Sequence, residues 1–312
     1  MSDLEVLVEN GYGGMSKRAA EKVIRALKEF ELSRGKPYFV LGLATGGSVE
    51  GLYDLLVKAE NENEISFENV ITFNLDEYIG LEKGHKESYR QFMEDNLFGR
   101  LNKRPKETYF PEMLFSNELT GGIETRELEI ILRDDLNYYK EGEDGKGQAI
   151  VISRRTKILN LKEVRNALDS YISKIKNAGG IDLQILGVGV DGHIGFHEAG
   201  IPFELGNGEY DTEMLLVKLD ISTRNKAVED GYFENLDDVP KYAFSMGVDL
   251  IMKAKELLVL ASGERKAKAV ARSFNGLSLG VPLSAVVEYE NTIYILDYEA
   301  ASLIRRPYKM SF

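Results

Sequence analysis

Short apolar runs alternate with helical stretches along this chain, and this alternation limits its fold more than any other feature. Apolar runs at 38–43 and 69–75 are followed by stretches with helical character at 49–60 and 87–97. A β-α-β-α alternation favours a doubly wound, largely parallel sheet. In such sheets, ligands bind at the carboxyl ends of the strands. We therefore predict an α/β protein with its site at that edge.

The rest of the chain continues this pattern. Predicted strands span 4–8, at an edge of the sheet, and 181–186, 214–219, 257–261 and 291–296. Predicted helices span 17–33, capped by Ser16, and 161–176, 241–253 and 262–274. Within 113–160, where no chemical motif stands out, we expect a helical stretch at 124–139 and a hairpin or extra strand at 149–159. We predict one domain over 1–312, with 113–160 as an insertion or small subdomain that covers an edge. A lid over the site is the alternative.

Charge and composition narrow the function. Lys and Arg total 39 against 51 Asp and Glu, which gives a net charge of −12 and argues against nucleic-acid and anionic-membrane partners. The absence of cysteine excludes disulfides and cysteine-ligated metals. The first residues lack a signal-peptide pattern, and no apolar run approaches the ~20 residues of a spanning helix. These features predict a cytoplasmic protein, and they are compatible with an anionic small ligand and with a homo-oligomer.

Residues 187–198 concentrate glycine, histidine and carboxylates directly after a predicted strand. The glycines satisfy G-x-G-x-x-G, but Asp191 inside the turn would oppose a phosphate and no helix follows, so dinucleotide binding is disfavoured. His193 lies between Asp191 and Glu198, a combination suited to proton transfer. A metal site of His193, His197 and Asp191 is the alternative, although Gly195 weakens the helical presentation that its spacing needs.

Three further groups follow strand ends or begin helices. Glycines and hydroxyls that suit an anion cradle lie between a strand and a helix: Thr45, Gly46, Gly47 and Ser48. A plain turn capped by Ser48 is the alternative. Asp76 and Glu77 either begin a solvated loop or place one carboxylate in a cleft. Lys266, in the first turn of a helix, is either a surface lysine or a phosphate ligand.

These motifs are collinear with those of a known family. Six segments resemble the glucosamine-6-phosphate deaminase/isomerase family. They are 41–48, 70–81, 85–89, 187–198, 239–243 and 262–267. The resemblance covers roughly 16–100 and 178–275. It implies a three-layer α/β/α sandwich with a largely parallel, Rossmann-like sheet, in agreement with the alternation of elements.

The resemblance also implies roles for the site residues. An amino-sugar 6-phosphate would bind to residues 45–48 and Lys266, with no metal or organic cofactor. His193 would move the proton that opens the pyranose ring, while Asp191 and Glu198 hold and polarise its imidazole. Asp76 would take the C2 proton and return it to C1. Water would then hydrolyse the iminium to release ammonia and a ketose 6-phosphate, which is fructose 6-phosphate from the glucosamine substrate.

Some positions depart from the family pattern. His197 stands where the family usually has Asn, and residues 231–234 lack the expected phosphate-binding arginine, with Arg224 and Lys226 upstream. Apolar residues at 215–217 occupy the region of the family's activator-binding basic residues. We therefore consider His197 and Glu77 as candidates for substrate specificity. The alternatives are galactosamine 6-phosphate as substrate, a related sugar-phosphate isomerase, a 6-phosphogluconolactonase-like hydrolase, and a non-catalytic sugar-phosphate sensor.

Overall fold

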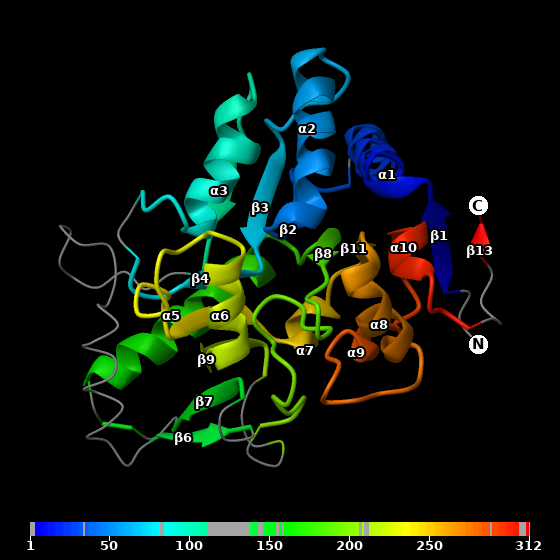
Figure 1. Cartoon of the computed structure of the whole chain (residues 1–312). Helices are drawn as coiled ribbons and strands as arrows, with labels where there is room; N and C mark the ends of the chain where they lie inside the picture. The colour runs from blue at the N-terminus through cyan, green and yellow to red at the C-terminus, as the bar shows by residue number, and fades with distance from the viewer. Residues whose placement is uncertain are drawn as a thin grey trace.

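The main sheet of the protein contains eight parallel strands within the part of the chain that the structure describes (Figure 1). This computed structural model describes residues 4–33, 35–81, 84–111, 138–142, 146–153, 156–157, 159–205, 208, 212–287, 289–305 and 310–311. The strand order is β13-β1-β12-β11-β8-β2-β3-β5. The bounds are β1 Glu5–Glu9, β2 Phe39–Leu43, β3 Val70–Asn74, β5 Glu107–Tyr109, β8 Leu183–Gly187, β11 Glu256–Ala261, β12 Thr292–Asp297 and β13 Met310–Ser311.

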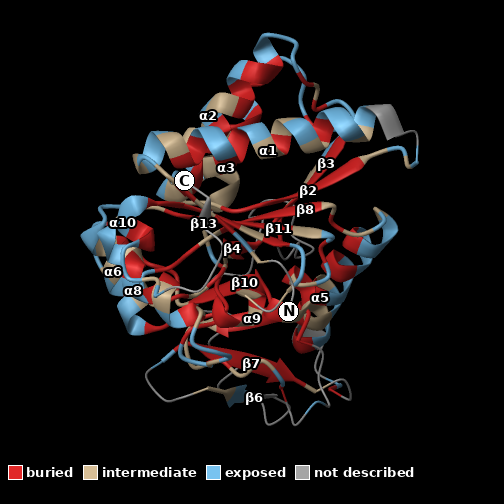
Figure 2. Cartoon of the chain, turned by 90° about the vertical axis from the view of Figure 1, so that its right-hand side faces the viewer, coloured by how far each residue is buried: buried red, intermediate tan, exposed pale blue. Residues whose placement is uncertain are grey.

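Helices cover both faces of this sheet. The helices of the described residues are α1 Gly11–Ser33, α2 Gly47–Asn61, α3 Tyr89–Asn96, η1 Phe98–Arg100, α5 Leu159–Asn177, α6 Ile221–Glu229, α7 Val248–Ile251, α8 Glu264–Ser273, α9 Ser284–Val287 and α10 Tyr298–Ala301. Helices α1 and α2 contact each other on one side of the sheet, and α5, α8 and α9 lie on the other (Figure 2). The predicted α/β/α sandwich with a parallel sheet is confirmed.

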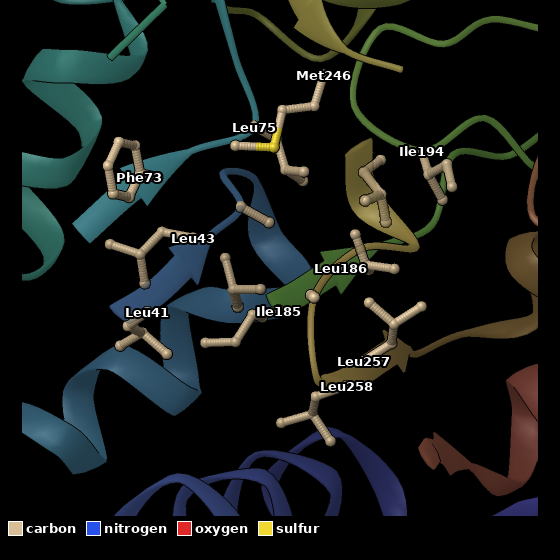
Figure 3. Packing of buried hydrophobic residues seen from close by; sticks show 14 of the residues in the cluster. Leu41, Leu43, Phe73, Leu75, Ile185, Leu186, Ile194, Met246, Leu257 and Leu258 are labelled. Carbon is tan, nitrogen blue, oxygen red and sulfur yellow. The ribbon is translucent and has the colours of Figure 1, made fainter. Parts of the chain in front are cut away.

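The central strands read as continuous apolar runs because helices cover them on both faces. Every residue of β2 is buried. Its Leu41 and Leu43 share one buried cluster with Ile185 and Leu186 of the adjacent strand β8 and with Leu257 of β11, the strand beyond it (Figure 3). Helix α5 turns one apolar stripe inward at helical spacing. The buried residues of that stripe are Leu161, Val164, Leu168, Tyr171, Ile172 and Ile175.

A second, antiparallel sheet lies at the end of the molecule away from α1 and α2 (Figure 2). Its order is β4-β10-β9-β7-β6, with bounds β4 Asp76–Tyr78, β10 Tyr242–Met246, β9 Met214–Lys218, β7 Gln148–Ile152 and β6 Tyr138–Glu141. One of its faces packs against the segment after His193. The apolar cluster formed there contains Ala149, Val151, Phe196, Ile201, Leu205, Leu215, Val217, Leu219 and Ala243. The second sheet therefore supports the loop that carries the histidine.

Several predicted elements are wrong or shifted. The helix predicted at 241–253 is strand β10 followed by the short helix α7. All five β10 residues are buried, and their backbone groups form hydrogen bonds with β4 and β9. The run is therefore buried on both sides as a central strand and does not form one apolar face of a helix. Ser16 lies inside α1, which begins at Gly11, and β1 pairs on both sides and is therefore not an edge strand.

The segment predicted as an insertion is partly described. The strand predicted at 149–152 is present as β7, but its hairpin partner is β6 and not residues 157–159, and Leu159 already belongs to α5. Residues 138–139 of the predicted helix 124–139 belong to β6, and 124–137 lie outside the described residues. Among the helices that are described, none is long and apolar enough to cross a membrane.

Candidate functional site

A cavity of about 180 Å³ lies at the carboxyl ends of β2, β3 and β8. It brings together four of the motifs that the sequence singled out. Its lining residues are Ala44, Thr45, Gly46, Gly47, Ser48, Leu75, Asp76, Tyr89, Gly187, Val188, Gly189, His193, Gly195, Phe196 and Lys266. The parallel strands explain this convergence, because their carboxyl ends meet at one edge of the sheet.

One wall of the cavity is the turn between β2 and α2. Gly46 has φ +98°, a left-handed conformation that glycine adopts without strain. No side chain caps α2, so Ser48 does not act as its N-cap. The Tyr12 hydroxyl donates to the Gly47 carbonyl at 2.7 Å and accepts from Gly51 N at 2.7 Å, which braces the first turn. An uncapped helix N-terminus beside a cavity is suited to an anion.

Lys266 adds a cation to this wall from the first turn of α8. Burial lowers the pKa of its ammonium, and the neighbouring Arg265 lowers it further. The two upstream cations have other partners. Arg224 donates to the carbonyls of Leu236 at 2.6 Å and Val239 at 3.1 Å, while Lys226 binds the Asp230 carboxylate. Neither lines the cavity.

Asp76 stands on the opposite wall, where the chain leaves β3 and enters β4 in the second sheet. It is only 5% exposed. Burial raises the pKa of its carboxyl to about 8, Glu77 adds to the rise, and His193 partly opposes it. Gly195, with φ +58°, gives the carboxylate its room, because a Cβ there would lie 3.3 Å from Asp76 Oδ2. Asp76 is thus a buried carboxyl poised to exchange a proton near neutral pH.

His193 is oriented by Asp191. Its Nδ1 lies 2.6 Å from Asp191 Oδ1, and the same oxygen accepts the His193 backbone N–H at 3.2 Å. The ring lies against the Gly189 backbone, where a Cβ would be 2.3 Å from Cε1. Burial alone would lower the pKa of His193, but the bond to Asp191 outweighs it and, with Glu198, raises that pKa. Asp191 thus holds Nδ1 and leaves Nε2 for proton exchange.

Glu198 does not line the cavity, and its charge favours the imidazolium form of His193. Its Oε2 accepts the Asp220 backbone N–H at 2.6 Å. Burial raises the pKa of its carboxyl to about 7, opposed by the Thr223 hydroxyl and by His193. Glu198 can therefore affect a ligand only indirectly, by its electrostatic effect on the His193 imidazole.

Glu77 and His197 also lie outside the cavity. Glu77 accepts backbone N–H groups of Tyr78, Tyr89 and Arg90 at 2.9–3.0 Å, so it holds the start of α3. Burial raises the pKa of Glu77 to about 7, and those N–H groups oppose the rise.

The His197 ring is held by backbone on both sides. Its Nε2 lies 3.3 Å from the Ile201 carbonyl, and Nδ1 accepts from Val248 N at 3.4 Å. Burial lowers the pKa of His197 to about 4. It is thus a neutral, buried ring. Across the described ranges, no three His, Asp or Glu side chains are grouped to hold a metal ion.

Sequence reasoning missed two lining aromatic residues. The Tyr89 and Phe196 rings stack with centroids 5.6 Å apart and an interplanar angle of 9°. Both lie within the segments 85–89 and 187–198, but no periodicity distinguishes a lining aromatic residue from a core one. The missed Tyr12 lies far from the turn in sequence, so only the packing of α1 on α2 shows its role.

Comparison with known proteins agrees with this geometry. Residues 13–195 match the family described as glucosamine-6-phosphate isomerases/6-phosphogluconolactonase. A glucosamine-6-phosphate deaminase of Thermoanaerobacter sp. (strain X514) is 35% identical over 302 residues, 96% of this chain and 95% of the relative. One from Clostridium perfringens (strain 13 / Type A) is 32% identical over 303 residues, 97% and 100% of the two chains. The chain therefore belongs to the glucosamine-6-phosphate isomerase/6-phosphogluconolactonase family.

Solved structures give the same result for the fold. A monomeric glucosamine-6-phosphate deaminase superposes with a TM-score of 0.71 at 30% identity, covering 96% of this chain and 100% of that one. A 6-phosphogluconolactonase of Neisseria gonorrhoeae FA 1090 superposes with a TM-score of 0.60 at 17% identity, covering 94% and 99%. The second likeness concerns the fold alone.

Proposed function

We propose that the cavity converts glucosamine 6-phosphate to fructose 6-phosphate and ammonia, by aldose–ketose isomerisation with deamination. One observation carries this assignment. A buried carboxyl and an oriented imidazole, Asp76 and His193, face one cavity whose other wall is an anion cradle with a lysine. Full-length relatives that are 32–35% identical and bear the name glucosamine-6-phosphate deaminase support it.

The phosphate binds at the cradle formed by residues 45–48 and Lys266. Backbone N–H groups at the start of α2 donate to its oxygens, and the helix dipole favours its charge. Lys266 supplies the balancing cation from α8. Because these groups hold the far end of the sugar, they fix C1 and C2 relative to the opposite wall.

Ring opening is the task of His193. Its Nε2 exchanges the proton that converts the pyranose to the open-chain aldehyde, moving it from the C1 hydroxyl to the ring oxygen. Asp191 stabilises the imidazolium that forms, because its carboxylate lies 2.6 Å from Nδ1. Glu198 adds negative charge behind the ring, which also favours imidazolium.

Isomerisation and deamination then follow. Asp76, as carboxylate, removes the C2 proton while a proton of the substrate's ammonium group passes to the C1 carbonyl oxygen, which gives an enolamine. Asp76 then returns its proton to C1, which leaves an iminium at C2. Water adds to C2 and ammonia departs, so the products are ketose 6-phosphate and ammonia. A base whose pKa is about 8 is well matched to this transfer near neutral pH. The proposal describes a cytoplasmic enzyme with a small-molecule partner, needing neither nucleic acid nor membrane.

The test is to assay the purified protein with three substrates. Glucosamine 6-phosphate, galactosamine 6-phosphate and 6-phosphogluconolactone are compared for release of ammonia, ketose or acid, with Asp76→Asn as control. We expect ammonia and ketose in equal amounts from a hexosamine phosphate, and none from Asp76→Asn. If the folded protein releases no ammonia from either hexosamine phosphate, the assignment is wrong, and acid release from 6-phosphogluconolactone would then identify a lactone hydrolase.

A further inference from the structure

The hairpin β6–β7 approaches the proposed catalytic machinery at one point. Gly147, the residue before β7, is buried against Glu198. A Cβ on Gly147 would lie 2.2 Å from Glu198 Oε2, 2.6 Å from its Cβ and 3.0 Å from its Cδ. Gly147 does not have a positive φ, so its backbone accepts other residues, and the three atoms nearest to an added Cβ all belong to the Glu198 side chain.

Two adjacent strands of the second sheet, β7 and β9, lead to the Glu198 carboxylate. Strands β7 and β9 are antiparallel, with Gln148 opposite Lys218, so the residue before β7 lies beside the residues after β9. Asp220, just past β9, donates its N–H to Glu198 Oε2 at 2.6 Å. Gly147 covers the same oxygen from the other strand.

The hairpin itself is held firmly at this place. A Cβ on Gly142 would lie 2.7 Å from the Gly147 carbonyl, so the residue after β6 packs directly against Gly147. Ala149 and Val151 of β7 share one apolar cluster with Phe196 and Ile201, on either side of Glu198 in sequence. The hairpin and the glutamate loop are thus one packed unit.

We propose that Gly147 is a positioning residue for catalysis, and that the hairpin of the segment 113–160 fixes the Glu198 carboxylate behind His193. The inference rests on the proposed role of Glu198. It gives this segment, which lies outside the family motifs, a function other than covering an edge or closing as a lid. Because Gly147 has no side chain, the Glu198 carboxylate can lie directly against the hairpin.

The central variant is Gly147→Ala. Its methyl group forces the buried carboxylate to move by an ångström or more, and misplacements of that size cost up to about 100-fold in rate. We expect kcat to fall by about 10- to 100-fold, with KM changed by less than about 3-fold, because the phosphate cradle is on the other wall. The limb of the kcat–pH profile that Glu198 contributes should shift, because burial sets the pKa of that carboxyl and the methyl group changes its surroundings.

Two matched controls separate positioning from folding. Ile152→Ala weakens the same strand on its opposite face, within the main core, and lowers the thermal midpoint without touching Glu198. Gly13→Ala adds a methyl group where no atom lies within 4 Å. Both variants should keep kcat within about 2-fold and leave its pH profile unmoved.

A double-mutant cycle with Glu198→Gln tests whether Gly147 affects kcat through Glu198. If Gly147 acts through Glu198, the double variant has the kcat of Glu198→Gln alone. A folded Gly147→Ala with near-normal kcat, or a double variant slowed by both factors multiplied, would overturn the inference. Glu198→Gln with normal kcat would overturn the role of Glu198 and the inference with it, whereas a wild-type protein without deaminase activity would overturn the proposed function itself.

Discussion

The two walls of the cavity are built in different ways. Residues 45–48 present backbone groups at an open helix end, where a Cβ on Gly46 or Gly47 would meet no atom within 4 Å. On the opposite wall Asp76 is buried, as is Glu198 outside the cavity, and burial raises the pKa of both carboxyls. Binding thus relies on exposed dipoles, and proton transfer on desolvated acids. Changes on the first wall should alter KM, and changes on the second should alter kcat and stability.

The largest effect is expected at Asp76. Asp76→Asn removes the proposed base but keeps shape and volume, so kcat for ammonia release should fall by about 1,000-fold or more. Binding of glucosamine 6-phosphate, measured by calorimetry, should change by less than about 5-fold, because the cradle is untouched. An Asp76→Asn enzyme with more than a tenth of the wild-type kcat would contradict the division between the walls.

The same variant should be more stable than the wild type at high pH. The folded pKa of Asp76 is about 8, above its unfolded value of about 3.9, so the folded state binds the extra proton between these values. Wild-type stability therefore falls as pH rises from about 4 to about 8, by about 5 kcal/mol in total. Urea unfolding at pH 5 and pH 8 should show the advantage of Asp76→Asn growing between them. An equal difference at both pH values would contradict the raised pKa.

His193→Gln should have the next largest effect. It removes the proposed ring-opening group and should lower kcat by about 100-fold, because spontaneous opening supplies some open-chain substrate. Binding of the open-chain analogue 2-amino-2-deoxyglucitol 6-phosphate should stay within about 3-fold of wild type by calorimetry. If that binding is lost while kcat is kept, His193 belongs to the binding wall.

Lys266 tests the other wall. Lys266→Met should raise KM by about 10- to 100-fold and change kcat by less than about 5-fold, because the ammonium contacts a phosphate that does not react. Lys268→Met, an exposed position on the same helix, is the matched control and should have a normal KM. Equal KM values for the two variants would remove Lys266 from the phosphate site.

The sequence predicts the parallel sheet and the edge where Thr45, Asp76 and His193 converge, because strand ends in such a sheet have only one place to meet. It does not predict β10, whose short buried run has no period that separates strand from helix. The contact of Gly147 with Glu198 joins distant segments through strand pairing, which leaves no local pattern. The sequence also does not predict the direction in which a side chain points. His197 belongs to the segment 187–198, but its ring lies outside the cavity.

His197 should have the smallest effect on function, although it departs most visibly from the family motif. His197→Asn removes a ring that lies outside the cavity, so the preference between the two hexosamine phosphates should stay within about 3-fold. The variant should instead lose on the order of 2 kcal/mol of stability at pH 7.5, because Ile201 and Val248 lose buried backbone partners.

This deficit should depend on pH. Burial holds the folded pKa of His197 at about 4, below its unfolded value of about 6.5, so the unfolded state binds the extra proton between these values. The contribution of His197 is complete above about pH 6.5 and is lost as the pH falls towards 4. Thermal midpoints of wild type and His197→Asn should therefore converge between pH 7.5 and pH 4.5. A constant gap, with a changed substrate preference, would return His197 to the specificity site.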